Sequence, residues 1–268
     1  MSQTLDPRAP IRIRHDTRMR LLAVTKIVDI TPRMRRITLH GDMTGFVSLS
    51  HADHIKAFFF PPGVEPRAVS IGEHGAEFAP SEKPDMRDYT PRYWDIASGT
   101  LELDFVLHGD GPASSWAAQA AIGHKLVIGG PRGSLVVPAK FDWYLLVGDE
   151  TALPALGRRI EELPAGSKIL AIIEVADAAE EQRFETGADL ELVFCHRNGQ
   201  AAGTSGLLLQ AVKGKQFPLG TAYAYVAGES TMSKAVRAHL TEERGFDPQY
   251  VKAAGYWVLG VSDAKEPH

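Results

Sequence analysis

Six consecutive residues in the first half of the chain combine side chains that suit a flat, phosphorylated ligand. The segment reads Arg87-Asp88-Tyr89-Thr90-Pro91-Arg92. A tyrosine ring can stack on a flavin, a threonine hydroxyl or amide can bond its N5 region, and the planar fork of an arginine can pair with phosphate. The same six residues are also typical of an ordinary barrel strand with a surface pair of arginines. This segment alone is compatible with both interpretations.

A second segment predicts a helix that begins at a glycine turn. It reads His108-Gly109-Asp110-Gly111-Pro112-Ala113-Ser114-Ser115-Trp116-Ala117. Pro112 and Ser114 are typical of a first helical turn, and residues 114–121 are good helix formers. A helix N-terminus presents free N–H groups and the positive end of a dipole, which suits a pyrophosphate. A simple capped helix with no ligand is the alternative.

A third pattern lies in the second half of the chain, where Leu145-Leu146-Val147-Gly148-Asp149-Glu150-Thr151-Ala152 reads as a strand that ends at the start of a helix. In a parallel α/β domain this position is the usual seat of a dinucleotide. The segment Ala227-Gly228-Glu229-Ser230 ends a later strand, and its glycine would allow close backbone approach to a nicotinamide. The alternative is a plain strand-to-helix turn that Thr151 caps.

The elements that must position these segments differ between the two halves. Apolar runs at 21–27, 34–39 and 55–60 and the strict alternation at 101–107 predict short strands, so the first half reads as an antiparallel Greek-key barrel. Strands at 144–147, 169–175, 190–195 and 222–227 alternate with helices at 153–163, 205–212 and 232–244, which predicts a parallel sheet with helices on its faces. We therefore expect an N-terminal arm at 1–19, a barrel domain at 20–140 and an α/β domain at 141–268.

Composition excludes several classes of protein. The chain has 268 residues, 44% hydrophobic and 23% charged, as expected of a globular protein with a sizeable core. One cysteine, Cys195, rules out an internal disulfide framework and fits a reducing cytosol. No apolar stretch is long enough to cross a bilayer, and we expect neither a membrane span nor a metal held by the protein. The net charge is -4, yet residues 1–40 hold nine basic and three acidic side chains, which suit a solvated arm or an anionic partner.

Six strings occur in an order that resembles the siderophore-interacting protein family, which reduces ferric siderophores on a ferredoxin-reductase plan. They are Arg87-Asp88-Tyr89-Thr90, Gly111 to Ala117, Gly130-Pro131-Arg132-Gly133-Ser134, Gly148 to Ala155, Ala227-Gly228-Glu229 and Gly255-Tyr256-Trp257. The resemblance runs from about Arg20 to Gly260 and implies FAD in the barrel and NADPH or NADH on the second domain.

The resemblance also implies residue roles. For FAD these are Arg87, Tyr89, Thr90, His108, Gly111, Ala113, Ser114 and Trp116, and for the nicotinamide cofactor Asp149, Glu150, Thr151, Ala152, Gly228 and Glu229. Tyr256 and Trp257 would lie on the flavin side. Lys56 resembles a family position for the ferric siderophore, with Arg132 and Arg92 as further cations. Where the family commonly continues Gly-Tyr-Trp with basic residues, this chain has Val258-Leu259.

The expected reaction needs no side chain as nucleophile or as acid or base, because the cofactors carry the redox chemistry. We expect a cytoplasmic monomer that binds no nucleic acid. The sequence leaves open NADPH, NADH or a ferredoxin as the electron donor, and it does not name the siderophore. Two rival functions are a flavin reductase with another small acceptor and a non-enzymatic anion-binding protein that uses the basic N-terminal segment.

Overall fold

The computed structural model describes residues 6–72, 75–109 and 111–261, so residues 1–5 of the expected arm and Asp110 of the glycine turn lie outside the described residues. The described chain divides into two compact units. Residues 11–136 form the first unit, and residues 137–261 with residues 6–10 form the second.

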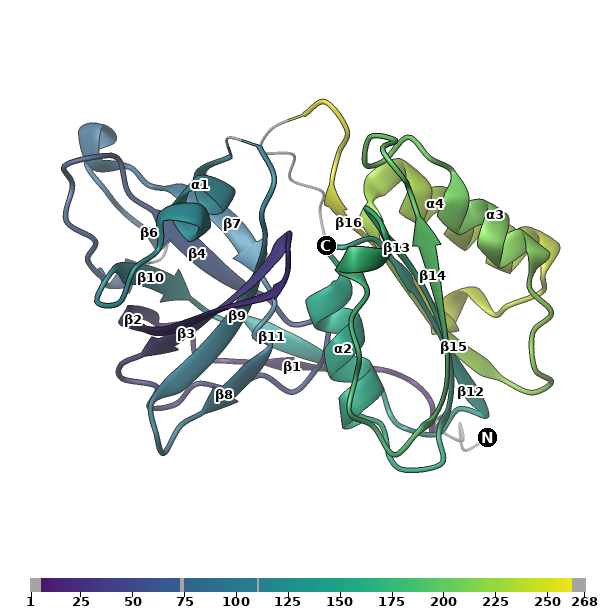
Figure 1. The fold of residues 1–268 in the computed structure, drawn as a ribbon. Coiled ribbons are helices and arrows are strands. Elements are labelled where there is room, and N and C mark those ends of the chain that lie inside the picture. The colour runs from purple at the N-terminus through teal and green to yellow at the C-terminus, as the bar shows by residue number, and fades with distance from the viewer. Residues whose placement is uncertain (1–5, 73–74, 110, 262–268) are drawn as a thin grey trace. The chain divides into compact units, whose positions relative to one another are not determined.

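The first unit is built on an antiparallel sheet. Seven strands of the described residues pair in the order β7-β4-β10-β2-β3-β9-β8, and Figure 1 shows that the sheet is curled. Their bounds are β2 Met19–Thr31, β3 Met34–His40, β4 Ile55–Phe59, β7 Asp85–Tyr89, β8 Tyr93–Asp95, β9 Thr100–Val106 and β10 Lys125–Gly129. Strand β10 returns from the end of the unit to lie between β2 and β4, which makes the connection a Greek key.

Alternation along the strands explains the core of this unit. Leu101, Leu103 and Phe105 of β9 are fully buried, because successive side chains of a strand point to opposite faces. Helix α1 (Pro112–Gln119) contributes the buried Ala113 and Ala117 to the same core cluster. The core therefore fixes α1 as well as the strands that carry the predicted flavin segment.

Smaller elements complete the first unit. Strand β1 (Ile11–Arg14) pairs with β11 (Gly133–Val136), so part of the basic N-terminal segment is a strand of this unit. Strands β5 (Ile71–Gly72) and β6 (Gly75–Ala76) pair with each other, and a 3-10 turn spans Pro80–Glu82.

The second unit is a parallel sheet with helices on both faces. Its described strands have the order β14-β13-β12-β15-β16, and all the neighbouring pairs are parallel. The strands are β12 Trp143–Gly148, β13 Lys168–Val175, β14 Asp189–His196, β15 Ala222–Glu229 and β16 Val251–Trp257. The helices are α2 Leu153–Glu162, α3 Leu207–Gly214 and α4 Ser230–Ala238, which continues as a π-helical turn at His239–Glu243; 3-10 turns span Ala178–Glu180 and Pro248–Tyr250.

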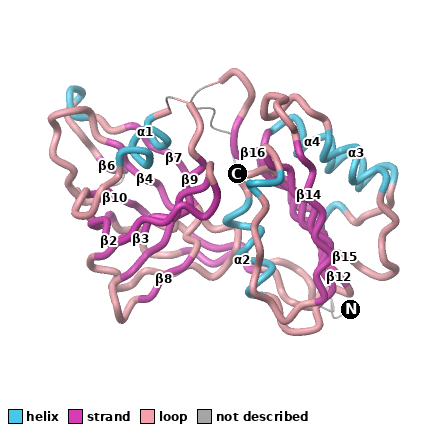
Figure 2. Tube along the Cα trace, viewed as in Figure 1, coloured by secondary structure: helices cyan, strands magenta, loops and turns pink. Residues whose placement is uncertain are grey.

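Two layers of helices cover this sheet. Helix α2 lies on one face, and α3 and α4 lie on the other (Figures 1 and 2). Trp143, Leu145 and Val147 of β12 belong to the same buried cluster as Leu208 of α3 and Val236 of α4. None of the helices in the described range has the length and apolar character of a membrane span.

The fold class predicted from the sequence is confirmed in both units. Three predicted helices are displaced at their ends. Helix α1 spans Pro112–Gln119 where 114–121 was expected, α3 begins at Leu207 and α4 begins at Ser230. Several strands were not predicted, among them β1, β10, β11 and β16. Residues 11–14 alternate isoleucine with arginine and all four are exposed, so no hydrophobic face marks this segment as a strand.

Candidate functional site

The tyrosine of the first segment lies with its ring against the core of the first unit. Tyr89 pairs with Ile55 of β4, and its ring centroid is 4.4 Å from that of Phe105, with 38° between the planes. Burial raises the pKa of Tyr89, although the nearby Arg87 opposes that change. The phenol therefore stays protonated, and the core fixes the plane of the ring.

The strand register separates the segment into two faces. Arg87 and Tyr89 are half-buried, whereas Asp88 between them is exposed, as alternation along β7 requires. Arg87 donates to the carbonyl of Met86 at 2.9 Å, and Thr90, just after the strand, is buried. The aromatic ring and the guanidinium that the sequence assigned to a flavin therefore share one face of the strand.

The second segment forms a helix whose N-cap carries no side chain. Gly111 precedes α1, Pro112 begins it, and no side chain of the residues that the structure describes caps the first turn. Apart from its chain neighbours, no described residue would have a heavy atom within 4 Å of a Cβ atom added at Gly111, so the described residues leave this turn open. The hydroxyl of the buried Ser114 accepts from the amide of the exposed His108 at 2.8 Å, which fixes the turn before the helix. These features fit a pyrophosphate bound by backbone N–H groups.

Aromatic packing connects the two segments. Trp116 of α1 packs on Phe105 with centroids 5.6 Å apart and on Phe59 with centroids 5.9 Å apart. Because Tyr89 packs on the same Phe105, the predicted ring site and the predicted pyrophosphate site have a fixed relation. Trp116 itself holds the helix on the sheet. Sequence reasoning missed Phe105, whose only signal was its place in the alternating strand.

The three cations expected to bind the substrate differ in their surroundings. Lys56 pairs with Asp88 at 2.5 Å. Arg92 has its Nε 3.8 Å from Asp104, and only 12% of its side chain is exposed. Arg132 is exposed, and within residues 6–72, 75–109 and 111–261 its side chain has no hydrogen bond or ion pair.

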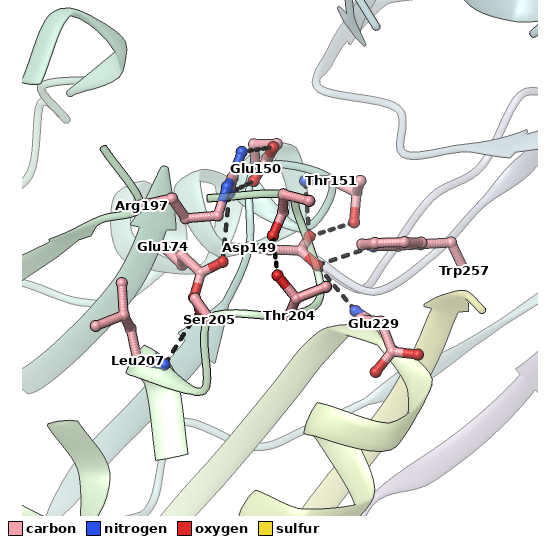
Figure 3. A network of polar contacts seen from close by, with 11 residues as sticks. Asp149, Glu150, Thr151, Glu174, Arg197, Thr204, Ser205, Leu207, Glu229 and Trp257 are labelled. Carbon is pink, nitrogen blue, oxygen red and sulfur yellow. Dashed lines mark hydrogen bonds and ion pairs between the residues drawn. The ribbon is translucent and has the colours of Figure 1, made fainter. Parts of the chain in front are cut away.

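The third segment places a carboxylate at the centre of a buried network (Figure 3). Asp149 is 4% exposed, and its carboxylate accepts from the amide of Thr151 at 2.9 Å, the hydroxyl of Thr151 at 2.5 Å, the amide of Glu229 at 2.8 Å and Nε1 of Trp257 at 2.9 Å. Burial and the neighbouring Glu150 raise the pKa of Asp149 to about 6, against the effect of these donors. Four donors occupy this carboxylate, so it holds the network together.

A second buried network lies beside the first (Figure 3). Arg197 donates to both oxygens of Glu150 at 2.7 and 2.6 Å and to Glu174 at 3.4 Å, while Ser205 donates to Glu174 at 2.5 Å. Burial alone would lower the pKa of Arg197, but these two carboxylates raise it. One guanidinium therefore serves two carboxylates, with its shorter bonds to Glu150 and a longer one to Glu174.

The end of β15 is shaped around Asp149. Gly228 has φ +139°, and a Cβ atom there would lie 2.5 Å from Oδ2 of Asp149. The side chain of Glu229 accepts from the amide of Met232 at 2.9 Å and so caps α4. Ala152, at the turn after Asp149, is fully buried, so its side chain is a packing group.

The aromatic residues at the end of β16 are tied to the same sheet. Tyr256 lies 2.8 Å from the hydroxyl of Tyr225, and Trp257 bonds Asp149 as described. A Cβ atom at Gly203 would lie 2.8 Å from the ring of Trp257, which shows how closely this loop packs on the indole. Across the described residues, no three His, Cys, Asp or Glu side chains are grouped so as to hold a metal ion.

Comparisons with known proteins agree on one family. Residues 141–260 match the model of the siderophore-interacting protein family, and residues 23–135 match that of the siderophore-interacting FAD-binding domain. The NADPH-dependent ferric-chelate reductase of Escherichia coli is 35% identical over 94% of this chain and 97% of its own length. This chain belongs to the siderophore-interacting protein family.

Two further similar proteins also match this chain over nearly its whole length. The ferric vibriobactin reductase of Vibrio cholerae is 30% identical over 91% of each chain. A crystal structure of a siderophore utilization protein from T. fusca is 39% identical, covers 96% of this chain and 98% of its own, and superposes with a TM-score of 0.84. The resemblance seen in the six strings is thus confirmed, and the first unit is an FAD-binding domain.

Proposed function

We propose that this protein is a ferric-siderophore reductase that uses NADPH or NADH as donor and FAD as its bound cofactor. The single observation that carries the proposal is the fixed geometry of the first unit, where Tyr89 and the uncapped N-terminus of α1 are linked through Phe105. The names of the relatives support the acceptor, since they are reductases of ferric chelates or of ferric siderophores.

The proposed roles in the first unit follow from these contacts. The ring of Tyr89, which packs against Phe105 with 38° between the planes, would stack on the isoalloxazine, and Thr90 would bond its edge. Arg87, on the same face of β7, and the open turn at Gly111 would hold the pyrophosphate. When bound, FAD would accept two electrons together from the nicotinamide and pass them one at a time to the ferric acceptor.

The proposed roles in the second unit concern the donor. The carboxyl ends of β12 and β15 meet at one edge of the parallel sheet, where dinucleotides bind in such domains. The cofactor would lie against the backbone at this edge, which the buried networks of Asp149 and Arg197 keep rigid. Gly228 leaves the room that Asp149 needs there. We propose the reaction to be cytosolic, in keeping with a chain that has a single cysteine.

The overall reaction balances without a side chain as acid or base. One NADPH and two Fe(III) chelates give NADP⁺, one proton and two Fe(II) chelates. Fe(III) is the substrate and arrives in its own chelator. Its cationic neighbour would be Arg132, whose side chain is exposed and makes no hydrogen bond or ion pair within the described residues. Lys56 and Arg92 lie beside Asp88 and Asp104.

Anaerobic reduction of a panel of chelates tests the proposal. The purified protein is loaded with FAD, mixed with NADPH, NADH or a reduced ferredoxin, and then given a ferric trihydroxamate, a ferric tricatecholate or a quinone, while an Fe(II)-specific dye traps the product. We expect the flavin absorbance to bleach with a nicotinamide and to return with a ferric chelate as Fe(II) appears. If the quinone reoxidises the flavin and neither ferric chelate does, the proposal is contradicted. Light scattering in the same buffer tests the expected monomer.

Tyr89→Ala examines the flavin site directly. Loss of the stacked ring is expected to weaken FAD binding about tenfold, the worth of one aromatic contact. The matched control is Tyr93→Ala, because Tyr93 lies in the same unit on β8 and is 56% exposed. Equal FAD content in both variants, measured from the flavin absorbance after gel filtration, would contradict the proposed role of Tyr89.

A further inference from the structure

Ser134, the last residue of the string Gly130 to Ser134, is a buried serine with hydrogen bonds on three sides. It is 3% exposed, and its hydroxyl lies 2.6 Å from Oδ2 of Asp53 and 2.7 Å from Nε2 of His15. The amide of Leu49 also donates to it at 3.1 Å. A carboxylate can only accept, so the hydroxyl donates to Asp53, and Nε2 of His15 carries the proton that it donates to Ser134.

Asp53 is a rigid anchor for this serine. The carboxylate is 4% exposed, and Oδ2 also accepts from the hydroxyl of Ser48 at 3.0 Å and from the amides of Leu49 at 2.9 Å and Ser50 at 3.1 Å. All three of these donors belong to the loop that leads to Asp53 itself. Among these bonds to Asp53, the one from Ser134 connects the loop at 48–53 to strand β11, near the end of the first unit's sequence.

The turn before Ser134 is held from its other side by the chain that leads from β1 into β2. The amide of His15 donates to the carbonyl of Arg132 at 3.0 Å, and the amide of Gly130 donates to the carbonyl of Arg18 at 3.2 Å. Gly130 has φ +100°, and a Cβ atom at Gly133 would lie 2.5 Å from the carbonyl oxygen of Ile13. The backbone on both sides of Arg132 is thus fixed by contacts that leave no room for side chains.

We propose that Ser134 and Asp53 are positioning residues for the ferric chelate, because they fix the turn that presents the guanidinium of Arg132. This inference rests on the proposed function. An exposed arginine on a mobile turn would lose much of its binding free energy in becoming ordered, whereas a fixed backbone leaves only the side chain to order. The ligand that this arrangement suits is an anionic chelate, whose oxygens accept from the planar fork of an arginine.

Steady-state kinetics of the FAD-loaded full chain with two acceptors test this. The acceptors are a ferric tricatecholate, which is anionic, and a ferric trihydroxamate, which is neutral. For Ser134→Ala we expect KM for the tricatecholate to rise about fivefold to tenfold, part of the worth of one hydrogen bond to a charged group, with kcat and the trihydroxamate kinetics unchanged. Ser134→Thr keeps the hydroxyl and should restore KM. Arg132→Gln should raise KM at least as much, and adding Ser134→Ala to it should have little further effect.

Ser48→Ala is the matched control, because Ser48 is also buried and also donates to Asp53 but lies outside the turn. It should leave both KM values unchanged. The positioning role is overturned if Ser134→Ala affects both acceptors equally, if Ser48→Ala reproduces it, or if its effect adds fully to that of Arg132→Gln. If the wild-type chain bleaches with NADPH yet reduces neither chelate, the proposed function is wrong and the positioning role falls with it. If it reduces both chelates and Ser134→Ala changes nothing, only the positioning role is wrong.

Discussion

The bond between Trp257 and Asp149 should make the effect of one substitution depend on pH. In Trp257→Phe the aromatic ring remains, but the Nε1 donor, 2.9 Å from the buried carboxylate, is lost. A hydrogen bond to a charged group contributes about 2 kcal/mol and a neutral one about 1 kcal/mol. The cost of this substitution should therefore follow the charge of Asp149.

The direction of the pH effect follows from the pKa of Asp149. Burial raises it to about 6 from the ordinary 3.8, so the free energy of unfolding that this group contributes falls as the pH rises between those values, by about 3 kcal/mol. Trp257 is among the donors that oppose the rise. Without it the folded-state pKa goes higher still, and the stability lost in the variant grows as the pH rises through about 6.

Thermal unfolding of the full chain at pH 5 and pH 8, followed by calorimetry, measures this difference. For Trp257→Phe we expect Tm to fall by about 4–8 °C at pH 8 and by about half as much at pH 5. Tyr256→Phe is the matched control, because Tyr256 and Tyr225 pair through neutral hydroxyls 2.8 Å apart, and its smaller Tm decrease should be the same at both pH values. An equal decrease for Trp257→Phe at both pH values, or a larger one at pH 5, would refute the reasoning.

Two further substitutions test the buried networks of the second unit. Arg197→Gln leaves two carboxylates without their partner and should lower the free energy of unfolding by about 3–5 kcal/mol in urea. The neighbouring His196→Gln, which removes an exposed hydrogen bond to Glu181, should change it by about 0.5 kcal/mol or less. Gly228→Ala brings a Cβ atom 2.5 Å from Asp149 at φ +139° and should lower the free energy of unfolding by about 2 kcal/mol or more. Gly214→Ala, at the open end of α3, should leave it unchanged or raise it slightly. Equal changes within either pair of variants would contradict the contact concerned.

Local patterns were enough to predict most elements. The alternation at 101–107 predicted β9 because every second side chain there is buried, and the apolar spacing of 153–163 predicted α2. The N-terminal start of α1 was predicted from Gly111 and Pro112, which act through backbone geometry that neighbouring residues determine. Strand β1 could not be predicted, because its alternating side chains are all exposed and only its pairing with β11 makes it a strand.

Pairings between distant side chains could not be read from the sequence. Lys56 and Arg92 were each predicted to bind the substrate. Register places Asp88 opposite Lys56, and Asp104 lies near Arg92, which the sequence did not show. The sequence shows the charge of a residue but not its neighbour on the next strand. Arg132 is exposed, and within the described residues its side chain makes no hydrogen bond or ion pair. Its turn is held by Ser134 and by the chain between β1 and β2, neither of which could be inferred from the string itself.

Around Asp149 the strings identified the family correctly but did not show which residues contact one another. Three of the six strings, around Asp149, Gly228 and Trp257, were each interpreted as a separate cofactor contact. The parallel order β12-β15-β16 brings them together, and a register shift between Gly228 and Glu229 sets Glu229 opposite Trp257. Glycine is needed at 228 because Asp149 fills the space that a side chain would take, and the indole at 257 donates to the same carboxylate. The three strings are therefore parts of one buried network, so a substitution in any of them changes the environment of the other two.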